Sequence, residues 1–282
     1  MGVCVVLLTV INCLHQNGTM KSIIFLESEN IMTKEDLYQS LKERFREVLK
    51  EYQIENDHLS VSCRALTPEE AIGKTKRTDY PILTGKDVMI QAEYKGFRGQ
   101  AFTDAPAAFE GMLEDILEMD IEHNPHDRGI FIATVNAVMA SLGLCEGTVH
   151  CRTNGPEFCA KDMLQFLETN YPDIKKIALV GFQPSLLEML ANSKYDVRVM
   201  DLNPNNIGQT KFGICVEDGT AMKEEIIYSY AELILCTGST LCNGTMVDYL
   251  DLDTEVLFFG TTASGAAPLL GLKRICFADK YM

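Results

Sequence analysis

The sequence predicts an α/β protein in which a domain built on a parallel sheet follows a small α+β domain. From Lys161 onward, short apolar runs alternate with short helical patterns, which is typical of parallel strands joined by helical crossovers. The runs are nearly continuous in Val, Ile, Leu and Phe, as expected for strands covered on both faces. The length of 282 residues fits about two domains. We therefore expect a Rossmann-like C-terminal domain.

The N-terminal segment MGVCVVLLTVINCL is apolar but shorter than the ~20 residues that a membrane-spanning helix needs. The first lysine is Lys21, so the basic start of a secretory signal peptide is missing. We interpret residues 1–31 as an atypical N-terminal extension. Two alternatives stay open, namely an extra strand or a translation start at Met32.

Residues 32–143 are predicted to form the small α+β domain. Its first helix, over 33–52, starts at the N-cap residue Thr33 and repeats apolar residues such as Leu37 and Leu41 at helical spacing. Three strands are then expected at 58–66, 87–94 and 96–103. Two helices are expected at 105–119 and at 129–143, the second ended by Gly143.

Residues 144–160 lack periodicity and are interpreted as a connector to the C-terminal domain, which spans 161–282. The helices expected in that domain lie at 161–169, 184–192, 244–250 and 265–271. The strands expected there lie at 176–182, 196–202, 231–237, 255–260 and 274–278.

The composition narrows the class of partner. The formal net charge of −15 argues against a nucleic-acid-binding protein, because phosphate contacts need a surplus of Lys and Arg. The ten cysteines are scattered, so a reduced, cytoplasmic protein fits better than a disulfide framework. We expect a small-molecule or metal partner and no membrane partner, and a homo-oligomer is left open.

Four predicted strand ends are rich in small and polar residues: 181–185, 201–204, 236–245 and 260–265. In open α/β sheets, ligands bind at the carboxyl ends of the strands. Glycines let backbone N–H groups approach a ligand, and helix N-termini favour anionic groups. The sequence therefore predicts a ligand site where these four segments converge.

A dinucleotide is a poor fit to these segments. Asp201 follows Gly181 by about 20 residues, which is the position of a ribose-binding acid. The first loop, however, has one glycine where the G-x-G-x-x-G pattern needs three, and Pro184 interrupts it. A conventional NAD or FAD site is therefore disfavoured, while a nucleotide-type or adenosyl ligand stays open. Asp201 could equally be a helix N-cap or a solvated loop acid.

The cysteines leave a metal site open. Cys236 and Cys242 flank the turn after one strand, and His150, Cys151, Cys159 and Cys276 are further soft donors. None of the spacings is a CxxC pair, so these thiols are either metal ligands or core residues. His123 and His126 flank Pro125 and are expected in a polar loop rather than as a metal pair. No HExxH, GxSxG or P-loop is present, so catalytic residues stay unknown.

The C-terminal domain resembles the DUF364 family, also called the putative heavy-metal chelation domain. The resemblance rests on LILCTGSTLCNGTM (233–246), FFGTTASGAAPLLGLKRIC (258–276), IALVGFQPSLLEML (177–190) and VRVMDLNP (197–204). RGIFIATVNAVMASLG (128–143) resembles a helix of the domain that often precedes it, which is similar to the N-terminal domain of enolase and is termed DUF4213. The chain departs from the family pattern at Gln183 and at 262–264.

The resemblance implies a site in the cleft between the two domains that binds a heavy metal or a metal-linked small molecule. The alternative is an enzyme with a nucleotide-type or adenosyl cofactor, and a third possibility is a binding module without turnover. The candidate metal ligands are Cys236 and Cys242. The candidate ligand-binding residues are Gly181, Phe182, Asp201, Thr237, Gly238, Ser239, Thr240, Asn243, Gly244, Thr245, Thr261, Thr262 and Asn136.

Overall fold

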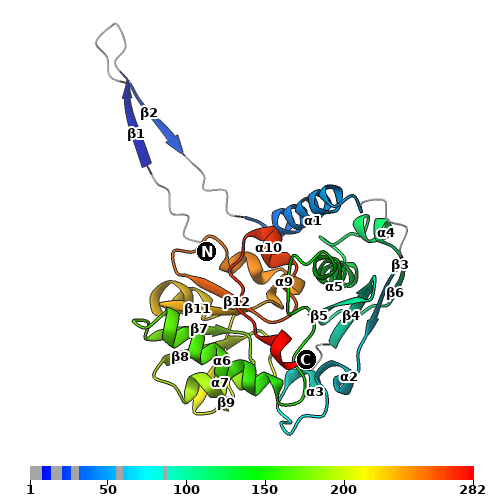
Figure 1. The fold of residues 1–282 in the computed structure, drawn as a ribbon. Coiled ribbons are helices and arrows are strands. Elements are labelled where there is room, and N and C mark those ends of the chain that lie inside the picture. The colour runs from blue at the N-terminus through cyan, green and yellow to red at the C-terminus, as the bar shows by residue number, and fades with distance from the viewer. Residues whose placement is uncertain (1–7, 14–20, 27–31, 55–59, 85–87) are drawn as a thin grey trace. The chain divides into compact units, whose positions relative to one another are not determined.

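The computed structural model describes residues 8–13, 21–26, 32–54, 60–84 and 88–282 (Figure 1). The chain forms two separate units, Met1–Thr33 and Lys34–Met282. In the first unit, β1 (Leu8–Cys13) pairs antiparallel with β2 (Lys21–Leu26). The extension therefore holds two strands where the sequence suggested one.

The larger unit contains a six-stranded sheet with the order β12-β11-β7-β8-β10-β9. Its strands are β7 (Lys176–Val180), β8 (Asp196–Asp201), β9 (Thr210–Lys211), β10 (Ile214–Asp218), β11 (Leu233–Thr237) and β12 (Val256–Phe259). All neighbouring pairs are parallel except β9 with β10. These strands and the helices between them confirm the predicted α/β fold class.

The order of the strands creates a reversal point in the sheet. The chain runs from the central strand β7 outward through β8 to β10, and then crosses to the other side of β7 to form β11 and β12. In doubly wound sheets, the carboxyl ends of the strands at such a reversal point border the crevice that binds ligands. Here that point lies between β7 and β11.

Two sequence predictions about this sheet were wrong. Strand β10 was missed because charged Glu217, which pairs with Arg198 of β8, interrupts its apolar residues, so it lacks a continuous apolar run. The strand predicted at 274–278 is reduced to a single bridge between Arg274 and Phe258. The chain then turns into the short 3-10 helix Ala278–Tyr281, which ends the pairing.

Helices α6 (Gly155–Asn170) and α7 (Pro184–Ala191) cover one face of the parallel sheet. Met163 and Leu167 of α6 and Leu187 of α7 share a core cluster with Leu179 and Leu235. Helix α6 starts inside the predicted connector 144–160, because Pro156 opens its first turn. The helix start predicted at 161 was therefore wrong.

The remaining helices of this half are short. They are α8 (Lys223–Glu225), the π-helix Ile226–Tyr230, α9 (Thr240–Asn243), the 3-10 helix Thr245–Tyr249 and α10 (Ala266–Leu270). The helix predicted over 244–250 was wrong in type, because Gly244 adopts a left-handed φ of 82° that ends α9 and separates it from the 3-10 helix. Gly244 is the N-cap residue of that 3-10 helix.

The second sheet is antiparallel, with the order β5-β4-β3-β6. Its strands are β3 (Ser60–Ala65), β4 (Val88–Tyr94), β5 (Phe97–Thr103) and β6 (Phe109–Met112). The helix predicted over 105–119 was wrong in its first part, which forms β6 before α4 (Leu113–Leu117). Gly111 lies in this strand, and glycine is a poor helix former. The strand starts predicted at 58 and 87 lie outside the described residues.

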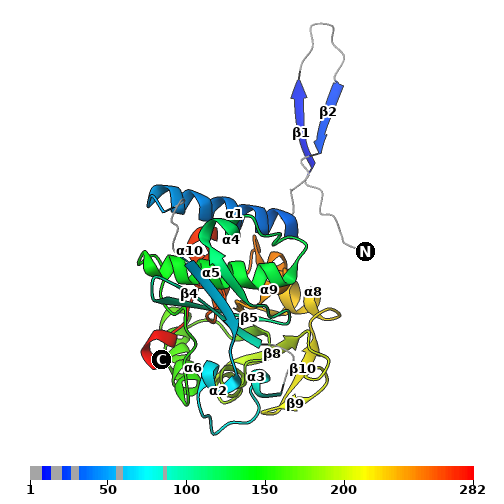
Figure 2. The same cartoon turned by 90° about the vertical axis from the view of Figure 1, so that its right-hand side faces the viewer.

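Helix α5 (Pro125–Ser141) packs on the antiparallel sheet, and α1 (Lys34–Glu51) lies on the outer side of α5 (Figures 1 and 2). Phe45 and Phe131 join the two helices edge to face at 5.7 Å. The sheet and α5 approach closely at Gly99, where a Cβ atom would lie 2.2 Å from the carbonyl oxygen of Ala133. Helix α5 starts earlier than predicted, with Asn124 as its N-cap.

Two further short helices, α2 (Pro68–Ile72) and α3 (Pro81–Thr84), lie between β3 and β4. Thr67 and Glu70 form a capping box at the start of α2. In the part of the chain that the structure describes, we find no helix with the length and apolar character needed to cross a membrane.

Candidate functional site

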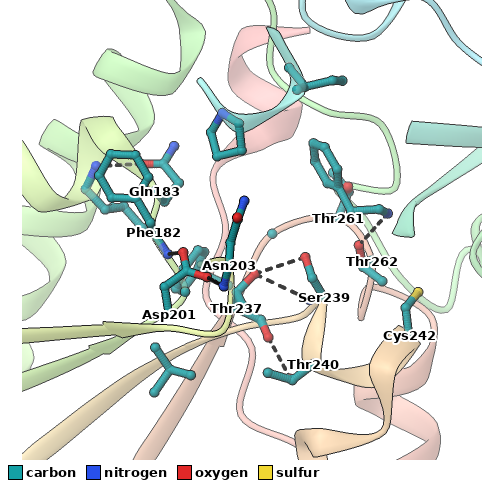
Figure 3. A pocket seen from close by; sticks show the side chains of 18 of the residues that line it. Phe182, Gln183, Asp201, Asn203, Thr237, Ser239, Thr240, Cys242, Thr261 and Thr262 are labelled. Carbon is teal, nitrogen blue, oxygen red and sulfur yellow. Dashed lines mark hydrogen bonds between the residues drawn. The ribbon is translucent and has the colours of Figure 1, made fainter. Parts of the chain in front are cut away.

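A cavity of about 480 Å³ lies at the carboxyl ends of the parallel strands (Figure 3). One wall is formed by the loops after β7, β8, β11 and β12, which the sequence predicted to converge. The opposite wall comes from the α2–α3 segment, the end of β5 and the segment before α6. Of the predicted site residues, the cavity is lined by Gly181, Phe182, Asp201, Thr237, Ser239, Thr240, Cys242, Asn243, Thr245, Thr261 and Thr262.

Two of the loops that line the cavity meet in a tight contact at the reversal point. Gly181 has a φ of 87°, and a Cβ atom there would lie 2.6 Å from the methyl carbon of Thr237. No larger residue fits at this position without displacing Thr237. The loops after β7 and β11 therefore touch each other, and the cavity lies across their tips.

The loop after β11 carries a chain of hydroxyl groups. The Oγ1 atom of Thr237 lies 3.1 Å from the Oγ of Ser239, as the dashed line in Figure 3 shows. Thr240 donates its hydroxyl to the carbonyl of Thr237 at 2.7 Å, which closes the turn. Thr240 is thus occupied in holding the loop, whereas Ser239 is partly exposed on the cavity wall.

Asp201 joins the loops after β7 and β8. Its carboxylate accepts hydrogen bonds from the backbone N–H of Phe182 at 2.9 Å, from that of Asn203 at 2.8 Å and from the side-chain amide of Asn206 at 3.0 Å. A carboxylate offers about four acceptor positions, so about one is left for a ligand. The helix N-cap alternative for Asp201 does not match these contacts, which hold two loops together.

The geometry after β7 does not form a phosphate site. Gln183 is the N-cap of α7, and its Oε1 accepts the N–H of Leu186 at 2.6 Å. Pro184, in the first turn, has no N–H to offer. The helix terminus on which a pyrophosphate would rest in a dinucleotide-binding fold is therefore already satisfied by the protein itself.

The charge of the lining also disfavours an anion. Its carboxylates belong to Asp104 and Asp201, and no lysine or arginine is present among the described lining residues. Most other lining residues are apolar or uncharged, such as Phe102, Phe182 and Phe259. The cavity thus suits a neutral or cationic molecule, which differs from our expectation that helix N-termini would attract anionic groups.

Asn136 lies outside the lining and is completely buried. Its side-chain amide N–H groups point at the carbonyls of Gln100, Thr261 and Thr262, at 2.9, 3.1 and 3.0 Å. Its Oδ1 accepts the N–H of Gly265 at 2.6 Å. The side chain therefore fastens the loop after β12 to α5 and β5, and all its hydrogen-bonding groups are engaged by the protein.

Three other predicted site residues also lie outside the lining, namely Gly238, Gly244 and Cys236. A Cβ atom at Gly238 would lie 2.9 Å from Ala263, so this glycine permits close packing of two loops. A Cβ atom at Gly244 would lie 2.3 Å from the Lys34 side chain, which packs against it. These glycines therefore shape the loop that carries Ser239 and Asn243.

The turn α9 is held by residues from the first half of the chain. Tyr38 donates its hydroxyl to the carbonyl of Leu241 at 2.8 Å, and Arg128 donates to the carbonyl of Cys242 at 3.0 Å. Arg128 is buried and lies 4.5 Å from the centre of the Tyr38 ring. Asn243 closes the turn by accepting the N–H and the hydroxyl of Thr245 at 2.9 and 2.8 Å.

Cys236 and Cys242 occupy different environments. Cys236 is completely buried in β11, where burial raises the pKa of its thiol, so the thiol stays protonated. Cys242 is almost buried but contributes to the cavity lining. Among the residues that the structure describes, no three His, Cys, Asp or Glu side chains come together as a metal site.

The sequence did not place His150, Cys151, Cys159 and Cys276 in the site, although it marked them as soft donors. All four line the cavity at the start of α6 and the C-terminal segment. A hydrogen bond with Cys151 raises the pKa of Cys159 to about 12, with burial as a further cause. The pKa of Cys276 is also raised, by its hydrogen bond with Cys159 and by burial. The thiols of Cys159 and Cys276 are therefore protonated near neutral pH.

The two histidines of EHNPHD, His123 and His126, are exposed and do not line the cavity. His123 contacts Asp120 at 3.1 Å, and His126 contacts the carbonyl of Pro106 at 3.2 Å. His123 lies in a turn, as predicted, whereas His126 lies in the first turn of α5.

The wall formed by α2 and α3 is anchored to the parallel-sheet side. The hydroxyls of Tyr80 and Ser185 lie 2.8 Å apart, and Arg77 forms an ion pair with Glu188 of α7. Arg77 also lies 5.3 Å from the centre of the Phe212 ring. Only tertiary structure brings Tyr80 and Ile82 to the cavity, and no local sequence signal marks them.

Comparison with known proteins supports the resemblance seen in the sequence. Residues 164–273 match the model of the family DUF364, described as "Putative heavy-metal chelation". This segment of the chain is therefore similar to DUF364. The matched segment includes the loops after β7, β8, β11 and β12 that line the cavity. The likeness of the first half to the enolase N-terminal domain, like the proposed domain boundaries, stays a prediction.

Two solved structures of DUF364 proteins with unknown function are similar to this chain. One, from Pyrococcus horikoshii, shares 17% identity and a TM-score of 0.46, with 80% of each chain covered. The other, from Desulfitobacterium hafniense, shares 12% identity and a TM-score of 0.43, with 81% of this chain and 82% of the other covered. No curated protein matches the chain.

Proposed function

We propose that the protein binds a neutral or cationic organic molecule in the cavity at the strand ends of its DUF364-like segment. A heavy metal, where one is handled, would enter as part of such a molecule. The observation that carries this proposal is the lining of the cavity, which offers carboxylates and hydroxyls but, in its described part, no lysine or arginine.

The size and polarity of the cavity support a small organic ligand. Its volume of about 480 Å³ falls within the range of roughly 300–1,000 Å³ that is usual for small-molecule sites. Apolar walls such as Phe182 and Phe259 would remove a flat ligand from water, while Asp201 and Ser239 would orient it. A position at the reversal point of the sheet is also where ligands of this fold class bind.

The family description supports the metal part of the proposal. The donor groups of the described residues bear on the form in which a metal would bind. A bare ion needs several donors from the protein, commonly four for zinc. The described residues provide no cluster of three such donors. A metal complexed by an organic ligand needs few or none, because the ligand already fills most of the coordination sphere. We therefore favour a metal chelate over a free ion.

A second candidate is an enzyme that uses an adenosyl or nucleotide-type cofactor. The spacing of Gly181 and Asp201 favours it, because Asp201 stands at the strand end where a ribose-binding acid is found. The self-capped start of α7 argues against a phosphate group in that position. Within this candidate, a nucleoside or adenosyl group is thus preferred to a phosphorylated nucleotide.

The first experiment would expose the purified protein to the low-molecular-weight fraction of a cell extract. Native mass spectrometry and elemental analysis would then identify what is retained. Ser239→Phe places a large side chain in the cavity wall, whereas Ser229→Phe makes the same change on the exposed surface of the π-helix. We expect the wild type and Ser229→Phe to retain one organic mass, with or without metal, and Ser239→Phe to retain none.

Each outcome separates the candidates. Retention of the same mass by Ser239→Phe, folded as judged by circular dichroism, would exclude the cavity as the site. A free metal ion without an organic mass would overturn the chelate proposal. Adenosine and AMP form a matched neutral and anionic pair for calorimetry, and the nucleoside candidate requires binding of adenosine, weaker binding of AMP and loss of adenosine in Asp201→Asn.

A further inference from the structure

We propose that His150 is a fixed hydrogen-bond acceptor in the cavity and that the bound molecule presents an N–H or O–H group to its Nε2 atom. This inference rests on the proposed function and adds to it the chemistry of one end of the ligand. His150 belongs to the segment before α6, across the cavity from the loops of the parallel sheet.

The tautomer of His150 follows from one hydrogen bond. Its Nδ1 lies 2.7 Å from the backbone carbonyl oxygen of Cys151. A carbonyl can only accept, so Nδ1 must carry the proton. In a neutral imidazole with a protonated Nδ1, the Nε2 atom has a free lone pair and acts as an acceptor.

The Nε2 atom is also accessible. It has no hydrogen-bond partner among the described residues. A buried atom without a partner would belong to the same group as the hydroxyls of Thr134 and Thr261, and Nε2 does not, so it is exposed to solvent. The His150 residue is half-buried and lines the cavity. We therefore place the unoccupied acceptor at the cavity surface.

The surroundings keep the ring neutral and hold it in place. Burial lowers the pKa of His150, against smaller opposing effects of the Cys151 carbonyl and the Cys276 thiol. The edge of the ring meets the Phe102 ring at 5.9 Å and 82°. The backbone N–H of His150 donates to Oε1 of the buried Gln100 at 2.8 Å, so β5 fixes the position of this segment.

Asp201 and His150 then require the same kind of group from a ligand, namely a hydrogen-bond donor. Asp201 and the Nε2 atom of His150 both accept hydrogen bonds, and both residues line the cavity, one at the end of β8 and the other in the segment before α6. A molecule that satisfies both must carry a donor at each end, such as a hydroxyl, an amino or an ammonium group. This requirement agrees with the charge of the lining and narrows the ligand class to a molecule with donors at both ends.

A matched pair of variants tests this role. The amide of Asn reaches the position of Nδ1, so His150→Asn keeps the bond to the Cys151 carbonyl but removes the acceptor in the cavity. The amide of Gln reaches the position of Nε2, so His150→Gln restores an acceptor there. With the low-molecular-weight extract fraction as the probe, we expect retention to fall about tenfold in His150→Asn and to stay within a few fold of wild type in His150→Gln.

Nuclear magnetic resonance provides a test that needs no ligand. Long-range ¹H–¹⁵N spectra of protein labelled at histidine should show His150 neutral at pH 7, with the proton on Nδ1. A proton on Nε2, or a cationic ring, would overturn the inference. So would equal retention of the ligand by the wild type and His150→Asn. If the wild type itself retains nothing, the proposed function fails, and the spectra still decide the tautomer.

Discussion

The strongest structural prediction concerns Asn136, the buried side chain that joins α5 to the loop after β12. We predict that Asn136→Ala destabilises the folded protein strongly, even without a ligand. The substitution leaves the N–H of Gly265 buried without its acceptor, which costs about 1–3 kcal/mol. The lost amide donors to three carbonyls, two N–H groups in all, add about 1 kcal/mol each.

Together these losses lower the free energy of unfolding by about 3–5 kcal/mol, which is a large part of the roughly 5–15 kcal/mol that holds a typical domain folded. Urea unfolding followed by far-ultraviolet circular dichroism measures this change, since the chain has no tryptophan for fluorescence. The matched control is Asn170→Ala, because Asn170 is exposed and donates one bond to Phe166 at 2.8 Å. We expect the control to cost less than about 1 kcal/mol.

The outcome decides between two roles for Asn136. If Asn136→Ala costs no more than Asn170→Ala and instead abolishes ligand retention, the side chain contacts the ligand and our structural reasoning is wrong. A large loss of stability would show that Asn136 acts by fastening the loop after β12 to α5 and β5.

Three further predictions concern the packing at Gly99, two buried hydroxyl groups and the dependence of stability on pH. Gly99→Ala would force a Cβ atom to within 2.2 Å of the Ala133 carbonyl, so we expect the melting temperature to fall by several degrees, a loss of about 1–3 kcal/mol or more. The buried hydroxyls of Thr261 and Thr134 have no hydrogen-bond partner in the described part of the chain, so Thr261→Val and Thr134→Val should each raise the free energy of unfolding by about 1 kcal/mol. A decrease in either variant, measured by urea unfolding, would contradict this reasoning. Because burial lowers the pKa of His150 in the folded state, the unfolded chain binds the proton more readily, and stability should decline as the pH falls below the ordinary value of 6.5. His150→Gln should remove that part of the decline in urea titrations at several pH values.

The parallel sheet was predictable because its strands are buried on both faces. Ile177, Leu179 and their neighbours form continuous apolar runs, and such runs can be recognised without knowledge of the tertiary structure. Strand β10 has no such run, since it carries Glu217, which pairs with Arg198 of the neighbouring strand β8. Near Gly111, a helical pattern competed with a short strand that only the pairing with β3 reveals.

The strand-end loops of the cavity could be predicted from small polar residues at the carboxyl ends of apolar runs. The roles inside those loops could not, because a side chain's direction depends on contacts far away in sequence. Asn136 forms hydrogen bonds within the protein and Gly244 packs against the Lys34 side chain, whereas Ser239 lies on the cavity wall. His150 and Tyr80 reach the cavity only through the fold.

The contact between Gly181 and the methyl group of Thr237 sets the depth of the site. In sheets of this topology, a ligand can descend between the two strands that flank the reversal point. Here the methyl group of Thr237 occupies the space beside Gly181, so we expect a bound molecule to lie along the loop tips and to contact both walls. We therefore expect this protein to discriminate between related molecules mainly by their length.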